Sequence, residues 1–536
     1  MKLLIQKGNK LSCFLLFLLI VVTVGIQLWF GFRKAGFHED EYYSYYSTNM
    51  TYGWNVPNGE WVDMQHYRNE FAVVPGEGFQ YGKVTTVQSW DVHPPFYYWI
   101  LHTVCSLTPN VFSKWQGIGI NMAAFAVAMI CLYATGNLLF QDRWKTYGSL
   151  AVCLCYAVSP ATVSSAMFVR MYALLSAMIL FSVYIHTKAW LQDRMTDPRF
   201  LFPLILSVYT GFLTHYYFLL FQFFLTAATC IALLIRKRRW RYSIIYGATV
   251  LFSLALAYLT YPACLGQMFR GQRGAEATAN MFDLSTLFVR IRFFGDLMNR
   301  YLFGGTFWVI LALFVLCLVC FIVKWSAKRR ACGGDVIWGI ILFLTSAGYL
   351  LTVSKSALML GDSSLRYIQP IFGVVLLLFF LFLRLLAEDC FGRRVGFYVE
   401  VVSLVLLTAL GVTGLVRGKV LFLFPEDRQK IAYAQAHENI PAVYLYKKES
   451  AWCVWESADE LFVYPEMYFA DAGQADPIRD ERINNASELI VYINNFGDTE
   501  EQIKRILRSN DSLNHFEMIC ESKFCTLYYF AKQPRG

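Results

Sequence analysis

Long apolar segments separated by short basic clusters dominate the sequence and restrict what the chain can fold into. Eleven segments are long enough to cross a hydrocarbon core of roughly 30 Å as helices that rise about 1.5 Å per residue. They lie at residues 11–32, 117–140, 146–166, 170–190, 200–216, 217–235, 242–262, 304–324, 335–353, 367–386 and 397–416. Only 16% of the residues are charged, against roughly 25% in soluble domains. The chain is therefore predicted to be an α-helical polytopic membrane protein.

The basic clusters predict how the chain is oriented in the membrane. They lie between alternate pairs of apolar segments: Arg143/Lys145, Lys188/Arg194/Arg199, the run 236–241, Lys324 with 328–330, and Arg393/Arg394. Lys and Arg favour cytoplasmic loops, so these clusters and the N-terminus are predicted to be cytoplasmic. Residues 95–107 are apolar but too short to cross, and we expect them to form a helix along the outer membrane surface.

The polar parts of the chain fall into two blocks. Residues 33–116 are predicted to be the first extracytoplasmic loop, within a transmembrane module that covers residues 1–416. Residues 417–536 are predicted to form a small extracytoplasmic α/β domain. In it, AVYLY (442–446), ELIVYIN (488–494) and FCTLYYF (524–530) have strand composition, and 499–510 has the apolar spacing of a helix.

The first loop begins with three adjacent acids, in GFHEDEYYSYY at 36–46. Carboxylates beside a bilayer are costly to desolvate, so a tight cluster there favours a functional site. Asp40 and Glu41 are candidates for a general base that takes a proton from an acceptor hydroxyl. The alternative is an ordinary solvated loop, since acids commonly flank a membrane span on its outer side.

The same loop ends in WDVHPPFYYW at 90–99, where Asp91 and His93 precede two prolines. The prolines fix the backbone at the start of the expected surface helix, which would hold Asp91 and His93 near the acids. A plain helix start is the alternative. Carboxylates and histidine also permit a divalent metal, with Glu41, Asp91 and His93 as candidate ligands, although their spacing defines no site.

Three basic residues lie at the predicted outer ends of spans: Arg170, His215 and Arg366. Arginine suits bidentate binding of phosphate, and a lipid phosphate would lie at that depth. Arg366 is the favoured phosphate ligand, with Arg170 second. The alternatives are arginines that extend to the lipid headgroups and a structural histidine. The outer loop 263–303 carries five arginines against three acids, which also suggests a bound anion.

Four motifs in this order resemble the GT-C membrane glycosyltransferases. They are the Asp-Glu pair after the first span, D-x-H-P-P at 91–95, R-x-Y-A-L-L at 170–175 and R-Y-x-x-P at 366–370. The protein O-mannosyltransferase/aminoarabinose-transferase group, with its bacterial family 39 members, is the most similar. The resemblance covers roughly residues 10–390, and Val169 stands where many bacterial relatives have an acid.

The resemblance implies a GT-C fold and an enzyme of the cell membrane. Such an enzyme moves a sugar from a polyprenyl-phosphate-linked donor to an acceptor hydroxyl on the outer or lumenal membrane face. Carried over residue by residue, it makes Asp40 the catalytic base and places Glu41, Asp91, His93 and Arg366 in the donor pocket.

The chemistry of the residues agrees with this hypothesis. A phosphate leaves without a protein acid, so one base and positive charge suffice, and a single displacement inverts the anomeric centre. The expected partners are a polyprenyl-phosphate-linked sugar, an acceptor lipid, glycan or protein, and membrane lipids. Nucleic acid is not expected despite the net charge of +9, because the basic residues fall in short loops. No cofactor is required, and a divalent metal is permitted.

A polytopic transporter or lipid flippase is the alternative function, and an assembly protein with an inactive site is a third option. Transporters tend to show inverted repeats and acids or broken helices near the middle of the membrane. Here the acids are in a predicted outer loop and no repeat is evident, which favours the glycosyltransferase. The sequence identifies neither the sugar nor the acceptor.

Overall fold

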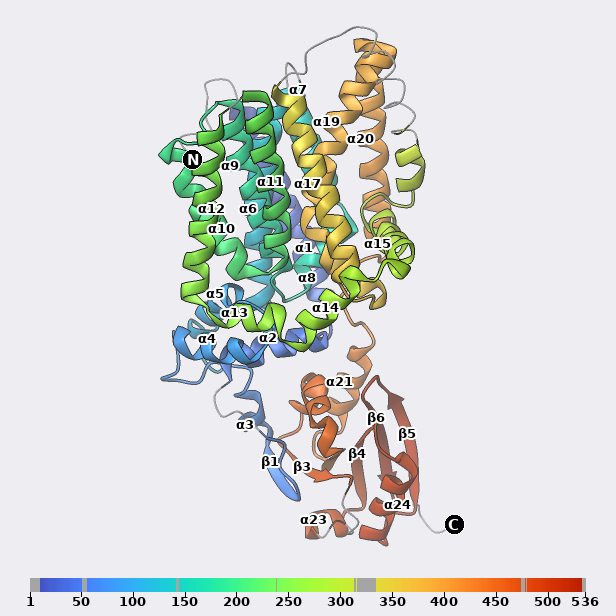
Figure 1. The fold of residues 1–536 in the computed structure, drawn as a ribbon. Coiled ribbons are helices and arrows are strands. Elements are labelled where there is room, and N and C mark those ends of the chain that lie inside the picture. Colours follow the sequence, from blue (N-terminus) through green and yellow to red (C-terminus); the bar gives the residue numbers. More distant parts are fainter. Residues whose placement is uncertain are drawn as a thin grey trace. The chain divides into compact units, whose positions relative to one another are not determined.

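The computed structural model describes residues 10–50, 55–140, 144–237, 239–312, 315, 334–473, 478 and 480–532. The chain forms two compact units. The first comprises Met1–Gly31, Thr85–Ile100 and Trp115–Phe422, and the second comprises Phe32–Val84, Leu101–Lys114 and Leu423–Gly536. The first unit is helical, and the second contains a β-sheet (Figure 1).

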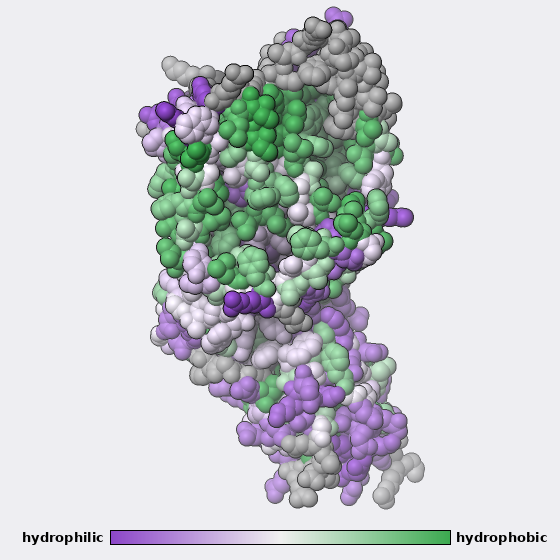
Figure 2. Space-filling model, viewed as in Figure 1, coloured by the Kyte–Doolittle hydropathy of each residue, from purple (hydrophilic) through white to green (hydrophobic). Residues whose placement is uncertain are grey.

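Apolar helices, most of them long, make up most of the first unit. They are α1 (Lys10–Arg33), α6 (Lys114–Leu139), α7 (Trp144–Ala157), α8 (Pro160–Met167), α9 (Tyr172–Leu191), α10 (Pro198–Thr214), α11 (Tyr217–Lys237), α12 (Trp240–Thr260), α17 (Gly334–Ser356), α18 (Leu365–Ile368), α19 (Phe372–Phe391) and α20 (Arg393–Val416). They run side by side as a bundle (Figure 1), and the face of this bundle in Figure 2 is largely apolar. A bundle with an apolar outer surface suits lipid, where only helices and closed barrels satisfy all backbone groups.

The described helices account for most of the predicted spans. Among the residues that the structure describes, eight helices are long and apolar enough to cross a membrane. The pair α7 and α8, bent by 57° at its break, makes a ninth if it counts as one span, and α10 is a shorter apolar helix. The predicted span at 304–324 lies largely outside the described residues, so the total of eleven stays a prediction.

Shorter helices connect the long ones. They are α4 (Tyr81–Trp90), α5 (Phe96–Ser106), α13 (Ala263–Phe269), α14 (Gln272–Phe282) and α15 (Leu287–Tyr301), with 3₁₀ turns η2 (Leu284–Thr286), η3 (Gly361–Ser364) and η4 (Gln369–Ile371). Helix α5 matches the predicted surface helix in extent, and Pro94 and Pro95 directly precede it. Helices α13 and α14 lie across one end of the bundle (Figure 1).

The second unit is built on a six-stranded mixed sheet in the order β1-β3-β2-β4-β6-β5. Strand β2 is parallel to β3 and β4, and the other pairs are antiparallel. Its elements are α2 (Glu39–Asn49), β1 (Glu60–Asp63), α3 (Met64–Arg68), α21 (Asp427–Ala436), β2 (Ala442–Tyr446), η5 (Lys448–Ser457), α22 (Ala458–Leu461), β3 (Glu466–Asp471), α23 (Glu481–Asn484), β4 (Glu488–Asn494), α24 (Thr499–Ser509), β5 (His515–Glu521) and β6 (Cys525–Ala531). The three predicted strands and the predicted helix are confirmed as β2, β4, β6 and α24.

Part of the first loop belongs to this sheet domain, which differs from the boundary predicted at residue 417. Strand β1 pairs with β3, so that Trp61 lies opposite Tyr468. The hydroxyl of Tyr67 donates to the carbonyl of Val454 at 3.0 Å. The parallel strands at the centre of the sheet are buried on both faces, as such strands usually are. Helix α24 packs against the apolar core of the sheet through Ile503 and Leu507. Trp61, from the first loop, packs against the same core, so the C-terminal sequence alone does not complete it.

Three acids of η5 and α22 give this unit a predicted pH dependence. Burial raises the pKa of Asp459 and of Glu460 to about 7, and burial with the nearby charge of Glu39 raises that of Glu456 to about 9. The folded unit therefore binds protons that the unfolded chain releases above its ordinary carboxyl pKa of about 4. Stability then falls as pH rises from about 4 through 7 and on toward 9.

We expect the melting temperature of the second unit to fall by about 5 °C or more between pH 5 and pH 9. Intrinsic tryptophan fluorescence follows the melt, and limited proteolysis of the second unit, whose η5 carries Trp452 and Trp455, locates the transition. The Asp459→Asn variant should show a shallower dependence, because its amide does not titrate. A melting temperature that stays level or rises over this range would contradict the prediction.

Candidate active site

Asp40 lies in the first turn of α2, in the second unit, where a capping arrangement fixes the backbone. The Nδ1 atom of His38 accepts from the backbone N–H of Asp40 at 3.1 Å, and the carboxylate of Glu41 accepts from the N–H of His38 at 2.7 Å. The side chain of Asp40 is 29% exposed, and its Oδ2 lies 3.7 Å from His38 Nδ1. A helix N-terminus stabilises a nearby negative charge. Asp40 is thus a positioned carboxylate that a substrate can still reach.

Glu41 points into the interior of the same unit. Its carboxylate receives a hydrogen bond of 2.9 Å from the Nζ atom of Lys34, and both side chains are fully buried. That ammonium also lies 5.3 Å and 5.0 Å from the ring centroids of Phe37 and Phe424. Within the second unit, these contacts join the segment before α2, the start of α2 and the beginning of the C-terminal segment. Glu41 therefore has a structural role, and its place in a donor pocket stays a prediction.

Replacing Lys34 by methionine is expected to destabilise the second unit by about 3–5 kcal/mol. The reason is that Glu41 would stay buried without the ammonium that compensates its charge. Denaturant unfolding, followed by tryptophan fluorescence or limited proteolysis, measures the change. The double variant Lys34→Met/Glu41→Gln removes both charges and should recover much of the loss. A single variant within about 1 kcal/mol of the wild type would show that the pair adds little.

Asp91 and His93 lie in the first unit, on a strap that we define as residues 91–95, between α4 and α5. The Oδ2 atom of Asp91 and the Nδ1 atom of His93 are 3.2 Å apart. Burial alone would raise the pKa of Asp91, but the hydrogen bond and charge of His93, with the charge of Arg170, hold it below its ordinary value. Asp91 is therefore ionised and orients His93.

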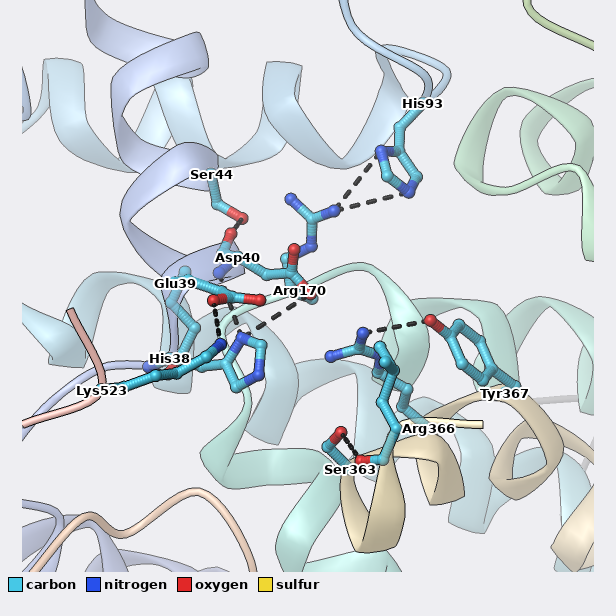
Figure 3. A network of polar contacts seen from close by, with 12 residues as sticks. His38, Glu39, Asp40, Ser44, His93, Arg170, Ser363, Arg366, Tyr367 and Lys523 are labelled. Carbon is cyan, nitrogen blue, oxygen red and sulfur yellow. Dashed lines mark hydrogen bonds and ion pairs between the residues drawn. The ribbon is translucent and has the colours of Figure 1, made fainter. Parts of the chain in front are cut away.

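Arg170 lies at the break between α8 and α9 and points toward the strap (Figure 3). Its Nη1 atom donates to the hydroxyl of Tyr98 at 3.1 Å, and Nη2 lies 3.4 Å from both ring nitrogens of His93. The side-chain amide of Asn121, on α6, donates to the carbonyl of Phe168 at 2.6 Å. The same carbonyl accepts from the backbone N–H of Arg170 at 2.7 Å, so Asn121 contacts the turn that carries Arg170. Asn121 carries no motif that would have identified it from the sequence.

His215 and Arg366 complete the group through aromatic contacts. The ring of His215, at the end of α10, lies 5.8 Å from His93 and 5.3 Å from Tyr172. The ring of Tyr172 lies 6.0 Å from that of Tyr367, whose hydroxyl accepts from Arg366 Nη2 at 3.0 Å (Figure 3). We call His93, Arg170, His215 and Arg366 the cation cluster.

Three members of the cation cluster are buried. Arg170, His215 and Arg366 are 4%, 6% and 7% exposed. The two arginines keep their charge at any physiological pH. Arginine guanidinium groups form bidentate hydrogen bonds to phosphate and carboxylate groups, so the cluster is suited to an anionic ligand.

The structure brings together one part of the predicted site and assigns the other part to a different unit. Asp91 and the cation cluster belong to the first unit, whereas Asp40 and Glu41 belong to the second. Within the described residues, no group of three His, Cys, Asp or Glu side chains is placed to hold a metal ion. The metal ligands Glu41, Asp91 and His93 therefore stay a prediction.

Comparison with known proteins gives one family match. Residues 92–261 match the family described as dolichyl-phosphate-mannose-protein mannosyltransferase. The match includes His93, Arg170 and His215 but neither Asp40 nor Arg366. A search of curated proteins found no match.

Solved structures resemble the chain over nearly its whole length. ArnT from Cupriavidus metallidurans bound to undecaprenyl phosphate is 11% identical, with 96% of this chain and 97% of that chain covered and a TM-score of 0.50. ArnT in the apo state gives the same identity and coverage with a TM-score of 0.46. The apo oligosaccharyltransferase of Archaeoglobus fulgidus is 9% identical, covers 98% of this chain and 75% of that chain, and gives 0.47. The first of these likenesses confirms the predicted fold.

Proposed function

We propose that this multi-pass membrane protein, which has the fold of the GT-C membrane glycosyltransferases, transfers a sugar from a polyprenyl-phosphate-linked donor to an acceptor hydroxyl. The observation that carries the proposal is the cation cluster, with two buried arginines at one end of an apolar helical unit. A lipid phosphate is an anion that bidentate arginines bind well. The similar ArnT structure, which was solved with undecaprenyl phosphate, supports a donor of this class.

In the proposed reaction, Asp40 acts as the base. Its carboxylate takes the proton of the acceptor hydroxyl, and the acceptor oxygen attacks the anomeric carbon of the sugar. The bond between that carbon and the phosphate oxygen breaks, and its electron pair leaves with the polyprenyl phosphate. Arg366 and Arg170 stabilise the charge on the phosphate, and one displacement inverts the anomeric centre. The proposal requires Asp40 to face the cation cluster across the bound sugar.

We place this reaction on the outer or lumenal face of the membrane. The basic clusters between alternate pairs of spans support a cytoplasmic N-terminus and an extracytoplasmic second unit. Glu41, Asp91 and His93 complete the proposed donor pocket. The proposal needs no cofactor, and a divalent metal near Asp91 and His93 is permitted.

Mass spectrometry of membranes from cells with and without the protein tests the proposed function. The cells that lack it should lose one glycan and accumulate one polyprenyl-phosphate-linked sugar. Unchanged glycans and unchanged lipid-linked sugars would overturn the proposal. A lipid-linked sugar that accumulates only in the inner leaflet would indicate a flippase and would overturn it as well.

A further inference from the structure

The side chain of Gln267, on α13, connects two segments that carry members of the cation cluster. It is buried, with 8% exposure. Its Nε2 atom lies 2.8 Å from the carbonyl oxygen of Gln88 and 2.6 Å from that of Asp91. The same nitrogen lies 2.9 Å from the hydroxyl of Tyr261, and Oε1 accepts a hydrogen bond from the hydroxyl of Tyr216. The two N–H groups and the carbonyl of this amide are therefore all engaged.

The strap depends on such an external donor. Gln88 and Asp91 belong to the last turn of α4 and the start of the strap, where helical carbonyls lose their intrahelical partners. Among the hydrogen bonds that the structure describes, one joins the two residues directly: the N–H of Asp91 donates to the carbonyl of Gln88 at 3.1 Å. Pro94 and Pro95 then follow, and proline has no N–H to donate. The amide of Gln267 therefore gives the carbonyl of Asp91 a donor directly before His93, and it gives the carbonyl of Gln88 a second one.

The oxygen of the Gln267 amide contacts the turn that contains His215. Tyr216, which donates to Gln267 Oε1, is the next residue after His215. Around these groups Tyr261 and Cys264 are buried in an apolar cluster, with Trp99 and Tyr216 packed against it. This packing keeps the amide in one position. Gln267 thus spans from the strap with His93 to the turn with His215, whose rings are 5.8 Å apart.

We propose that Gln267 is a positioning residue that fixes His93 against His215 and Arg170 in the cation cluster. The inference deepens the proposed function and rests on it for its catalytic consequence. The geometric part of the inference, which is the placement of the two histidines, does not depend on the proposed function. A displacement of a reacting group by about 1 Å lowers the reaction rate on the order of 100-fold. Loss of the Gln267 amide should therefore lower the rate of sugar transfer.

The variant Gln267→Leu tests the inference, with Gln222→Leu as its matched control. Gln222 is also a buried glutamine, on α11, and its amide bonds Ser182 and Thr226. Ser182 contacts His186, so the resonance of His186 reports on the hydrogen bonds around Gln222.

The measurement is NMR spectroscopy of the full-length protein in nanodiscs with ¹³C-labelled histidine. The resonances are assigned by single histidine substitutions. The chain has 8 histidines, which is few enough to resolve.

The two variants should give opposite patterns. Gln267→Leu should move the His93 and His215 resonances and leave His186 in place, whereas Gln222→Leu should move His186 alone. Gln267→Leu should also lower kcat/KM for sugar transfer by about 100-fold, and the control should stay within about threefold of the wild type. Unmoved His93 and His215 resonances in Gln267→Leu would overturn the inference. A wild type that transfers no sugar, with the resonance pattern as expected, would overturn only the proposed function.

Discussion

Replacing Asp40 by asparagine is expected to lower sugar transfer by about a thousandfold while membrane insertion and folding stay normal. General base catalysis typically contributes 10²–10⁴-fold, and an amide cannot take the proton of the acceptor hydroxyl. The fold should tolerate the change, because the side chain of Asp40 is partly exposed and the backbone N–H of Asp40, not its carboxylate, makes the capping bond to His38. Transfer from a labelled polyprenyl-phosphate sugar in proteoliposomes measures the effect.

The chain offers a matched control one residue away. Glu39 lies in the same turn of α2 and forms an ion pair of 2.8 Å with Lys523 (Figure 3). Glu39→Gln removes a carboxylate of similar exposure, and an exposed pair contributes little to stability. It should transfer sugar within about threefold of the wild type. Transfer by Asp40→Asn at the level of Glu39→Gln would show that Asp40 is not the base.

Replacing Arg366 by methionine is expected to weaken the binding of polyprenyl phosphate by about 100-fold. Hydrogen bonds from a charged donor contribute about 1.5–3 kcal/mol, and about 2.7 kcal/mol corresponds to 100-fold. Methionine keeps much of the apolar volume beside Phe168, over whose ring the guanidinium lies at 5.4 Å. Arg366→Lys should restore only part of the affinity, because an ammonium lacks the planar fork that suits phosphate. Titration of the nanodisc protein with undecaprenyl phosphate gives the affinities.

Arg292→Met serves as the control for Arg366→Met. The side chain of Arg292, on α15, is 84% exposed and pairs only loosely with Asp296, at 3.9 Å. Its loss should change the affinity for undecaprenyl phosphate by less than about twofold, since exposed charges are screened. If the wild type and Arg366→Met bound undecaprenyl phosphate with equal affinity, Arg366 would not be part of the donor pocket.

The helical architecture and half of the candidate site were predictable from the sequence. Long apolar segments leave few alternatives to helices, and α6, α9, α12, α17 and α20 lie where those segments predicted them. His93 was singled out by its place before two prolines in D-x-H-P-P, and Arg170, His215 and Arg366 by their positions at the predicted outer ends of spans. In the structure these four residues lie in one group, connected through Tyr172 and Tyr367, and their role in a donor pocket stays a prediction.

Contacts between distant segments could not be predicted in this way. Strand β1 has four residues, too few for a periodic pattern, and it becomes a strand only by pairing with β3. Asn121 and Gln267 are neutral amides whose roles depend on the carbonyls that other segments bring to them. The buried pair of Lys34 and Glu41 appeared in the sequence as parts of a polar loop, and only tertiary packing shows that both are inside.

The most direct test of the proposed mechanism is a structure of the full-length protein in nanodiscs with a bound polyprenyl-phosphate sugar, determined by electron cryomicroscopy. The distance to measure joins the Asp40 carboxylate to the Arg366 guanidinium. We expect the phosphate to contact Arg366 and the sugar to fill the space up to Asp40, with both residues on the extracytoplasmic side. A donor phosphate that lies away from Arg366, or an Asp40 carboxylate separated from the sugar or on the cytoplasmic side, would contradict the mechanism.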